Sequence, residues 1–235
     1  MCIETVTAQQ TLDLVQTLYE KKLLTYPRTD SQFITDDMED TARQVISIVC
    51  RQLPLFSDIS ITPDIARVTD NSKVTDHHAI LPTVQLEKQD VSALPQSEQK
   101  ILNLVGMRLL CATGEKHTYA ETQITLSCEG KFKAKGKTVV QNGWKAIEEL
   151  FKASLKTKEK DDPMKSLPEV HEGDVLDNVS ASVTEHFTTP PKQYTEDTLL
   201  SAMETAGNDQ FDDDTEKKGL GTPATRAGII EKPVS

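Results

Sequence analysis

The spacing of apolar residues changes twice along this chain, and this change constrains the fold more than any other feature of the sequence. From residue 1 to about 115, apolar residues recur at the three- and four-residue spacing of amphipathic helices. From about 116 to 190 they alternate with polar residues, which is typical of strands. Pro190-Pro191 marks the second change. The sequence therefore predicts an α+β chain with a helical domain (1–115), a β-rich segment (116–190) and a partial helical domain (191–235).

Local signals locate some of the expected elements. Thr7 and Gln10 form a capping-box pattern before the first helix. Residues 122–134 alternate around a turn at Glu129-Gly130 and predict a hairpin. Residues 175–187 predict a later strand by the same alternation.

The chain is acidic, which limits how it could bind nucleic acid. Asp plus Glu number 37 against 26 Lys plus Arg, so the formal net charge is −11. None of the three segments is basic. This argues against binding by bulk electrostatic attraction, and an anionic partner would have to be held by local contacts.

The spacing of the cysteines and the hydropathy of the chain indicate which cellular compartment to expect. The four cysteines lie far apart with no C-x-x-C spacing, which favours free thiols over a zinc site or a disulfide framework. No run approaches the ~18 apolar residues of a membrane span, and the start of the chain lacks signal-peptide features. We expect a cytoplasmic protein without a membrane partner or a metal site. The cysteines are Cys2, Cys50, Cys111 and Cys128.

Residues 26–31 (YPRTDS) are the clearest candidates for a reactive site. Pro27 favours an extended backbone at Tyr26, so Tyr26 and Arg28 project to the same side. A phenol is a weak nucleophile at neutral pH, and a guanidinium beside it favours the phenolate and can bind a phosphate through two parallel donors. The pair suits attack on a phosphodiester. The alternative is a plain turn in which a later polar residue caps the next segment.

Residues 23–31 (LLTYPRTDS) resemble the active-site motif of the type IA DNA topoisomerases, in its topoisomerase III form. Three further stretches resemble family motifs in the same order. Residues 76–83 (DHHAILPT) resemble the histidine motif, 190–207 (PPKQYTEDTLLSAMETAG) the helix entering the next domain, and 219–230 (GLGTPATRAGII) the start of a DNA-contacting helix. The resemblance covers nearly the whole chain.

This resemblance implies a reaction and a set of roles. Tyr26 would attack single-stranded DNA to form a transient 5′-phosphotyrosine, and another strand would pass through the break before religation, which relaxes or decatenates DNA. Arg28 and His77 would act at the scissile phosphate. His78 is the weaker candidate because neighbouring residues of an extended segment face opposite ways. Contacts with DNA are implied for Thr29, Asp30, Ser31, His78, Thr222, Thr225 and Arg226.

Residues 219–226 also have a physical argument of their own. A Gly-x-Gly loop that runs into a helix capped by Thr222, with Pro223 as its first residue, would present backbone N–H groups to a phosphate. Ordinary capping with a solvated Arg226 is the alternative. The pair Asp212 and Asp214 superficially resembles a magnesium site, but its polar surroundings favour a solvated acidic loop.

The family's N-terminal metal-binding domain has no counterpart here, since twenty-five residues precede Tyr26. The resemblance thus implies a central fragment whose partners are single-stranded DNA and that missing domain, at the bacterial nucleoid. Mg²⁺ would serve the full-length enzyme through ligands outside this chain, and the fragment alone would bind no cofactor and relax no DNA. Two alternatives are a noncatalytic DNA-binding or protein-interaction module, favoured by the negative charge, and a tyrosine recombinase, in which basic catalytic residues would precede the tyrosine.

Overall fold

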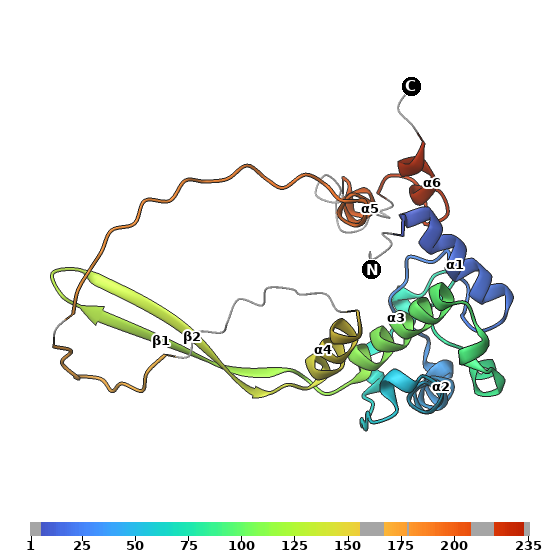
Figure 1. The fold of residues 1–235 in the computed structure, drawn as a ribbon, viewed down its shortest axis with the longest axis horizontal. Helices are drawn as coiled ribbons and strands as arrows, with labels where there is room; N and C mark the ends of the chain where they lie inside the picture. The colour runs from blue at the N-terminus through green and yellow to red at the C-terminus, as the bar shows by residue number, and fades with distance from the viewer. Residues whose placement is uncertain (1–5, 156–166, 178, 208–218, 233–235) are drawn as a thin grey trace. The chain divides into compact units, whose positions relative to one another are not determined.

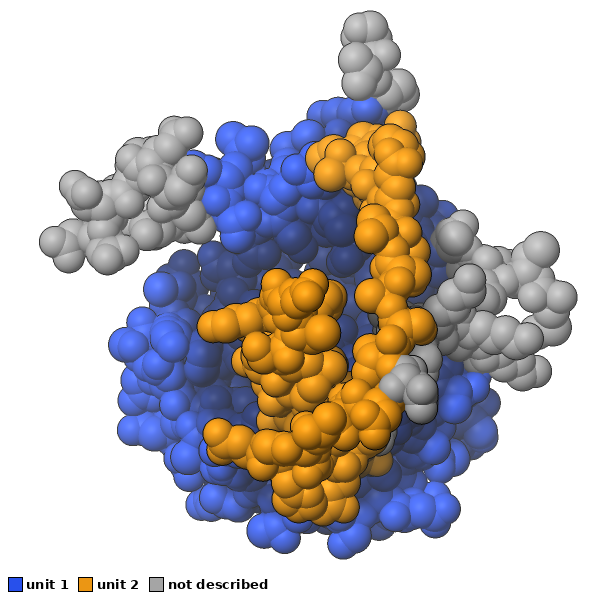
Figure 2. All heavy atoms as spheres, turned by 90° about the vertical axis from the view of Figure 1, so that its left-hand side faces the viewer, with its two compact units in different colours: residues 1–116, 143–158, 194–235 blue, residues 117–142, 159–193 orange. Residues whose placement is uncertain are grey.

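The computed structural model divides the chain into two compact units (Figures 1 and 2). It describes residues 6–155, 167–177, 179–207 and 219–232. Unit 1 comprises residues 1–116, 143–158 and 194–235, and unit 2 comprises residues 117–142 and 159–193. This division differs from the three segments expected from sequence, because residues after 142 and after 193 return to the helical unit.

The elements confirm the α+β class (Figure 1). The α-helices described in unit 1 are α1 (Ala8–Glu20), α2 (Glu39–Gln52), α3 (Gln96–Thr113), α4 (Trp144–Ser154), α5 (Glu196–Thr205) and α6 (Arg226–Glu231). Short 3₁₀ helices lie between them at Asp36–Met38, Pro54–Phe56, Ile65–Val68, Asn71–Lys73, Val84–Lys88 and Val91–Ala93. Unit 2 contains the antiparallel strands β1 (Thr118–Ser127) and β2 (Lys131–Gln141).

The capping signal at the first helix is confirmed. The Thr7 hydroxyl accepts the backbone N–H of Gln10, and the Gln10 side chain accepts the backbone N–H of Thr7 at 3.0 Å. These reciprocal bonds satisfy donors that a helix start leaves without partners. Val15 and Leu18 then fall on the buried face of α1, so capping and apolar spacing together determine where this helix begins and how it packs.

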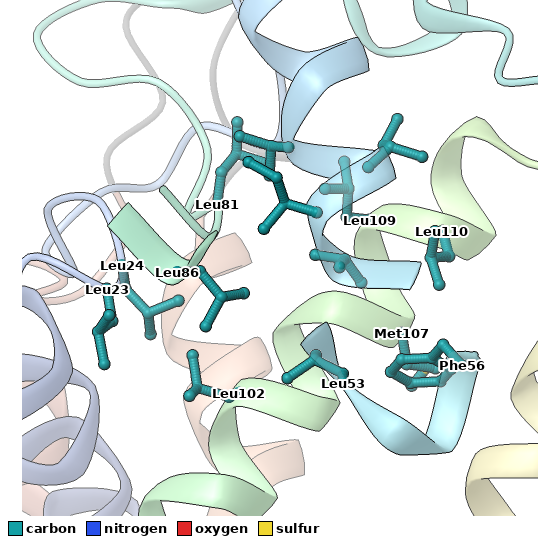
Figure 3. Close-up of a cluster of buried hydrophobic side chains, with 14 of the residues drawn as sticks. Leu23, Leu24, Leu53, Phe56, Leu81, Leu86, Leu102, Met107, Leu109 and Leu110 are labelled. Atoms are coloured by element: carbon teal, nitrogen blue, oxygen red, sulfur yellow. The ribbon is translucent and has the colours of Figure 1, made fainter. Parts of the chain in front are cut away.

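The core of unit 1 forms where α2, α3 and the 3₁₀ turns meet (Figure 3). Leu102 and Phe56 are fully buried there. Gly106 lets α3 pack closely against Leu53 at the end of α2, since a Cβ at position 106 would lie 2.9 Å from Cδ1 of Leu53. Leu23 and Leu24 belong to the same cluster. The segment that precedes Tyr26 is therefore fixed to the core.

Helix α4 lies inside the segment that the sequence analysis assigned to the β-rich region. Its Ile147 and Phe151 are buried, and the helix packs on α3. The three- and four-residue spacing of Trp144, Ile147 and Phe151 is the sequence signal that could have identified it.

The hairpin prediction is confirmed, but the later strand prediction is wrong. Strands β1 and β2 pair antiparallel, and Glu129 adopts a positive φ of 50° in the turn between them. Within the described residues of 175–187 there is no strand. Side chains such as Val183 and Phe187 are exposed there. Alternation alone does not make a strand, because a strand needs a neighbour to accept its backbone hydrogen bonds.

An ion pair joins the end of α1 to the start of α3. The Lys21 ammonium lies 2.7 Å from both carboxylate oxygens of Glu98, and Glu98 is buried. We expect Lys21→Met to lower the free energy of unfolding by about 1–3 kcal/mol, because the carboxylate stays buried without its partner. Urea unfolding followed by circular dichroism measures this loss.

The matched control is the ion pair between Arg51 and Glu87, which has the same 2.7 Å separation but about half of each side chain exposed. Arg51→Met should cost less than about 1 kcal/mol, because solvent screens exposed pairs. Equal losses in the Arg51 and Lys21 variants would contradict the prediction.

Candidate active site

Two segments far apart in sequence, 22–33 and 77–83, are hydrogen-bonded to each other and build the site. The backbone N–H of Thr25 donates to the carbonyl of Leu81 at 2.9 Å. The Thr25 hydroxyl accepts the backbone N–H of Leu81 at 2.9 Å and donates to the carbonyl of Ala79 at 3.2 Å. These bonds hold the histidine-containing segment beside the tyrosine-containing one.

Apolar anchors place both segments on the core (Figure 3). Leu23 and Leu24 are 2% and 1% exposed, and Leu81 is 7% exposed. Each side chain gains burial energy only when its backbone lies against the core. The position of the polar residues that follow Leu24 is therefore fixed by hydrophobic packing.

The ring of Tyr26 contacts two other aromatic rings. The His77 imidazole lies 4.3 Å from it, centroid to centroid, at an interplanar angle of 41°. Tyr19, on the last turn of α1, meets it edge to face at 5.5 Å and 80°. Such contacts restrict the orientation of an aromatic side chain. Tyr19 was not among the residues predicted for the site, although its place at the end of a predicted helix directly before the motif was an available signal.

Several residues after Tyr26 have hydrogen-bond partners inside the protein. The Thr29 hydroxyl donates to the carbonyl of His77 at 3.0 Å. The Ser31 hydroxyl donates to the carbonyl of Lys73 at 2.9 Å. His78 Nδ1 lies 2.8 Å from the carbonyl of the next residue. These contacts order the loop, and the DNA contacts expected of Thr29, Ser31 and His78 stay predictions.

A cleft of about 280 Å³ is lined by several of the expected site residues. One group of lining residues follows Tyr26 or belongs to the histidine segment, and the other belongs to the loop before α6. They are Arg28, Thr29, Asp30, Thr75, Asp76 and His77 in the first group, and Gly221, Thr222, Pro223 and Arg226 in the second. Tyr26 is not among these lining residues, but its ring contacts that of His77, which is.

The charges in the cleft are mixed. Arg28 is exposed, and among the described residues it makes no ion pair within 4.0 Å. Asp30 and Asp76 are exposed carboxylates in the same lining. Arg28 is therefore the group best suited to an anionic ligand, and the carboxylates disfavour unspecific anion binding.

The start of the last helix differs from the expectation. Helix α6 begins at Arg226 with Thr225 as its N-cap, not at Pro223. Before it, the Thr222 N–H donates to the Thr225 hydroxyl at 3.0 Å, and the Thr225 N–H donates to the Thr222 carbonyl at 2.9 Å. The backbone N–H groups of Thr222 and Thr225 are thus bonded within this turn. The prediction that Thr222 caps a helix whose first residue is Pro223 was wrong.

Arg226 is buried and holds the loop before it. The residue is only 8% exposed. Its Nε donates to the carbonyl of Leu220 at 3.0 Å, and a terminal nitrogen donates to that of Gly221 at 3.4 Å. The alternative of a solvated arginine was therefore wrong. Its expected contact with DNA stays a prediction, supported by its place in the cleft lining.

The described residues contain no group of three or more His, Cys, Asp or Glu side chains that could hold a metal ion. Cys50 and Cys111 are partly buried, and burial raises the pKa of both thiols, that of Cys111 to about 11. Cys128 is exposed. Cys2, Asp212 and Asp214 lie outside the described residues. The residues that the structure describes thus do not fit a Mg²⁺ site.

Over the described ranges, none of the helices is both long enough and apolar enough to cross a bilayer.

Comparisons with known proteins identify the family of this chain. The sequence profile of a family described as DNA topoisomerase matches residues 3–235. The chain is 37% identical to DNA topoisomerase 3 of Bacillus licheniformis over 96% of its length, and 34% identical to DNA topoisomerase 3 of Vibrio cholerae over 95%. These alignments cover 32% and 35% of the two relatives, so the chain spans about a third of their length.

A solved structure shows the same fold. Full-length topoisomerase I from Thermotoga maritima superposes with a TM-score of 0.63 at 23% identity, over 97% of this chain and 34% of that one. At this identity the superposition supports the fold, while the family assignment rests on the profile and the relatives. The chain belongs to the type IA DNA topoisomerase family and resembles its topoisomerase III members.

Proposed function

We propose that Tyr26 is the nucleophile of a DNA strand-passage reaction. Its phenolic oxygen attacks a phosphorus of single-stranded DNA and loses its proton. The bond from phosphorus to the 3′-oxygen breaks, and that oxygen leaves as a protonated 3′-hydroxyl. The product is a 5′-phosphotyrosine ester, and attack by the same 3′-hydroxyl reverses the reaction. One phosphodiester replaces another in each direction, so the cycle needs no ATP.

The contact between Tyr26 and His77 beside Arg28 carries this proposal. The 4.3 Å ring contact joins the tyrosine motif to the histidine motif across 50 residues of sequence, and both Arg28 and His77 line the same cleft. The Arg28 guanidinium would bind the non-bridging oxygens of the phosphate and stabilise the charge that develops on them. His77 would hold the phenol ring and donate a hydrogen bond to the phosphate.

We propose further that these residues act together with segments that the longer relatives have and this chain lacks. The relatives are about three times as long as this chain, and the described residues here do not fit a metal site. The N-terminal metal-binding domain of the family would supply the Mg²⁺ ligands and the acid that protonates the 3′-oxygen. The 235-residue chain alone would then relax no supercoiled DNA. Its DNA substrate would place the longer enzyme at the bacterial nucleoid in the cytoplasm.

Mapping the covalent adduct tests this function. The longer enzyme is incubated with single-stranded DNA, denatured, digested with nuclease and trypsin, and analysed by mass spectrometry. Trypsin cleaves after Lys22 and Arg28, so Tyr26 lies in the peptide of residues 23–28. Each of the other three tyrosines falls in a different tryptic peptide.

We expect the nucleotide remnant on peptide 23–28. A remnant on another tyrosine peptide, or relaxation of plasmid by the 235-residue chain alone with Mg²⁺, would contradict the proposal. DNA binding without any adduct would favour the noncatalytic DNA-binding module.

The two adjacent histidines should respond differently to substitution. His77→Gln removes the ring that contacts Tyr26 and should lower the rate of adduct formation about 100- to 1000-fold, the usual loss when one hydrogen-bond donor to a developing charge is removed. His78→Gln is the matched control, because His78 bonds to the local backbone, and its effect should stay within about threefold of the unmodified enzyme. Quenched time courses with labelled DNA give both rates. A larger loss in the His78 variant would reverse the assignment.

A further inference from the structure

One face of the hairpin in unit 2 gathers lysines. Successive side chains of a strand point to opposite faces, so the odd-numbered residues of β2 share one face. They include four exposed lysines at successive positions of this face: Lys131, Lys133, Lys135 and Lys137. No acidic residue lies between Lys131 and Lys137. The chain as a whole has a net charge of −11. The strand nevertheless concentrates positive charge on one face, which the overall composition does not reveal.

The neighbouring strand leaves most of this positive charge in place. The partners of the four lysines on β1 are three uncharged polar residues and one carboxylate: Ser127, Thr125, Gln123 and Glu121. Glu121 lies 3.9 Å from the ammonium groups of both Lys135 and Lys137. Among the described residues, Lys131 and Lys133 have no ion pair within 4.0 Å. We name these eight side chains the basic face.

Aromatic rings lie at one end of the basic face. The Lys137 ammonium is 4.4 Å from the centre of the Tyr119 ring, and Tyr119 is 47% exposed. The His117 ring lies 5.9 Å from that of Tyr119. Proteins that bind single-stranded nucleic acid commonly combine a basic track for phosphates with aromatic rings for bases.

We propose that the basic face is a second DNA-binding site, which holds the phosphates of one single strand. Alternate residues of a strand are ~6.7 Å apart, so the four lysines follow one another along the strand in a track that one extended DNA backbone can follow. The uncharged Ser127, Thr125 and Gln123 beside the row can donate hydrogen bonds to the same phosphates. The basic face belongs to unit 2, whereas the residues that line the cleft with Arg28 and His77 all belong to unit 1.

The salt dependence of binding tests the proposal in the 235-residue chain. The test variant replaces Lys131, Lys133, Lys135 and Lys137 by Gln. The control variant makes the same change in charge at four exposed lysines elsewhere: Lys88, Lys100, Lys192 and Lys232. A third variant replaces the four hairpin lysines by Arg, which keeps the charge. The probes are a fluorescent oligothymidylate of about 16 nucleotides, the upper site size of small single-strand-binding domains, and a duplex of the same length.

We expect the Gln variant of the hairpin to lower the slope of log K against log salt by about 1.4–2.8, from two to four lost phosphate contacts at ~0.7 each. Affinity for the oligothymidylate at low salt should fall at least about tenfold. The control and Arg variants should keep the original slope. Tyr119→Leu should weaken binding of the oligothymidylate without changing the slope.

Three results would overturn the proposal: an unchanged slope in the Gln variant, an equal loss in the control variant, or a loss confined to the duplex. Unfolding midpoints measured in parallel show whether each variant keeps its fold. Because the lysines take no part in the covalent step, adduct formation at Tyr26 is an independent measurement, and this proposal can fail while the proposed function stands.

Discussion

Replacing Tyr26 by phenylalanine in the longer enzyme should abolish the covalent DNA adduct. The change removes one oxygen atom and keeps the ring that packs against His77 and Tyr19, so the site should keep its shape. Without the phenolic oxygen no phosphotyrosine ester can form. The expected loss exceeds about 10⁴-fold, as for removal of other covalent nucleophiles. Denaturing gels of protein incubated with end-labelled DNA detect the adduct directly.

Tyr19→Phe is the matched control for this experiment. Tyr19 lies 5.5 Å from the Tyr26 ring, and the substitution again removes only a hydroxyl group. Its ring would still support Tyr26 edge to face, so adduct yield should stay within about threefold of the unmodified enzyme. Retained adduct in the Tyr26 variant, or loss in the Tyr19 variant alone, would show that the nucleophile is not Tyr26.

Gly219→Ala should also reduce adduct formation strongly, although residue 219 does not line the cleft. Gly219 has a φ of +62°, and a Cβ there would overlap the carbonyl oxygens of Met203 and Glu204 at the end of α5. The loop must move away, which displaces the carbonyl groups that anchor Arg226. A displacement of about 1 Å in a catalytic site can cost on the order of 100-fold in rate, and we expect a loss of that size.

The control is Gly173→Ala in unit 2. Gly173 also has a positive φ, +93°, but a Cβ there would meet nothing within 4 Å. Both variants carry the backbone strain of an alanine at positive φ, and only the variant at Gly219 adds a steric overlap. The rate of adduct formation in the Gly173 variant should therefore match that of the unmodified enzyme. Similar losses in both would show that strain, and not displacement of the loop, causes the effect.

The sequence by itself determined the features that depend on near neighbours. The capping box of Thr7 with Gln10 and the apolar spacing of α1 follow from interactions within a few residues. The hairpin follows from alternation around a short turn. The spacing of Tyr26 and Arg28 places a phenol and a guanidinium on the same side of an extended backbone, and the resemblance of residues 23–31 to the family motif favoured a catalytic role over a plain turn.

Where sequence reasoning failed, a distant partner decided the result. Residues 175–187 alternate like a strand, but the described chain gives them no neighbouring strand. The sequence left a solvated Arg226 open as the alternative to a DNA contact, and the folded loop instead gives its side chain two backbone carbonyl partners. Charge counts along the sequence found no basic segment, whereas the extended β2 places four lysines on one face and its pairing with β1 sets mostly uncharged residues beside them.

The site as a whole belongs to the tertiary structure. Tyr26 and His77 are in ring contact because buried leucines and the hydrogen bonds of Thr25 hold their two segments together. Loop closure over some fifty residues has an entropic cost that no local pattern can offset, and burial of apolar side chains in the shared core offsets it. The sequence thus specified the candidate residues, and packing of the core decided that Tyr26 and His77 meet.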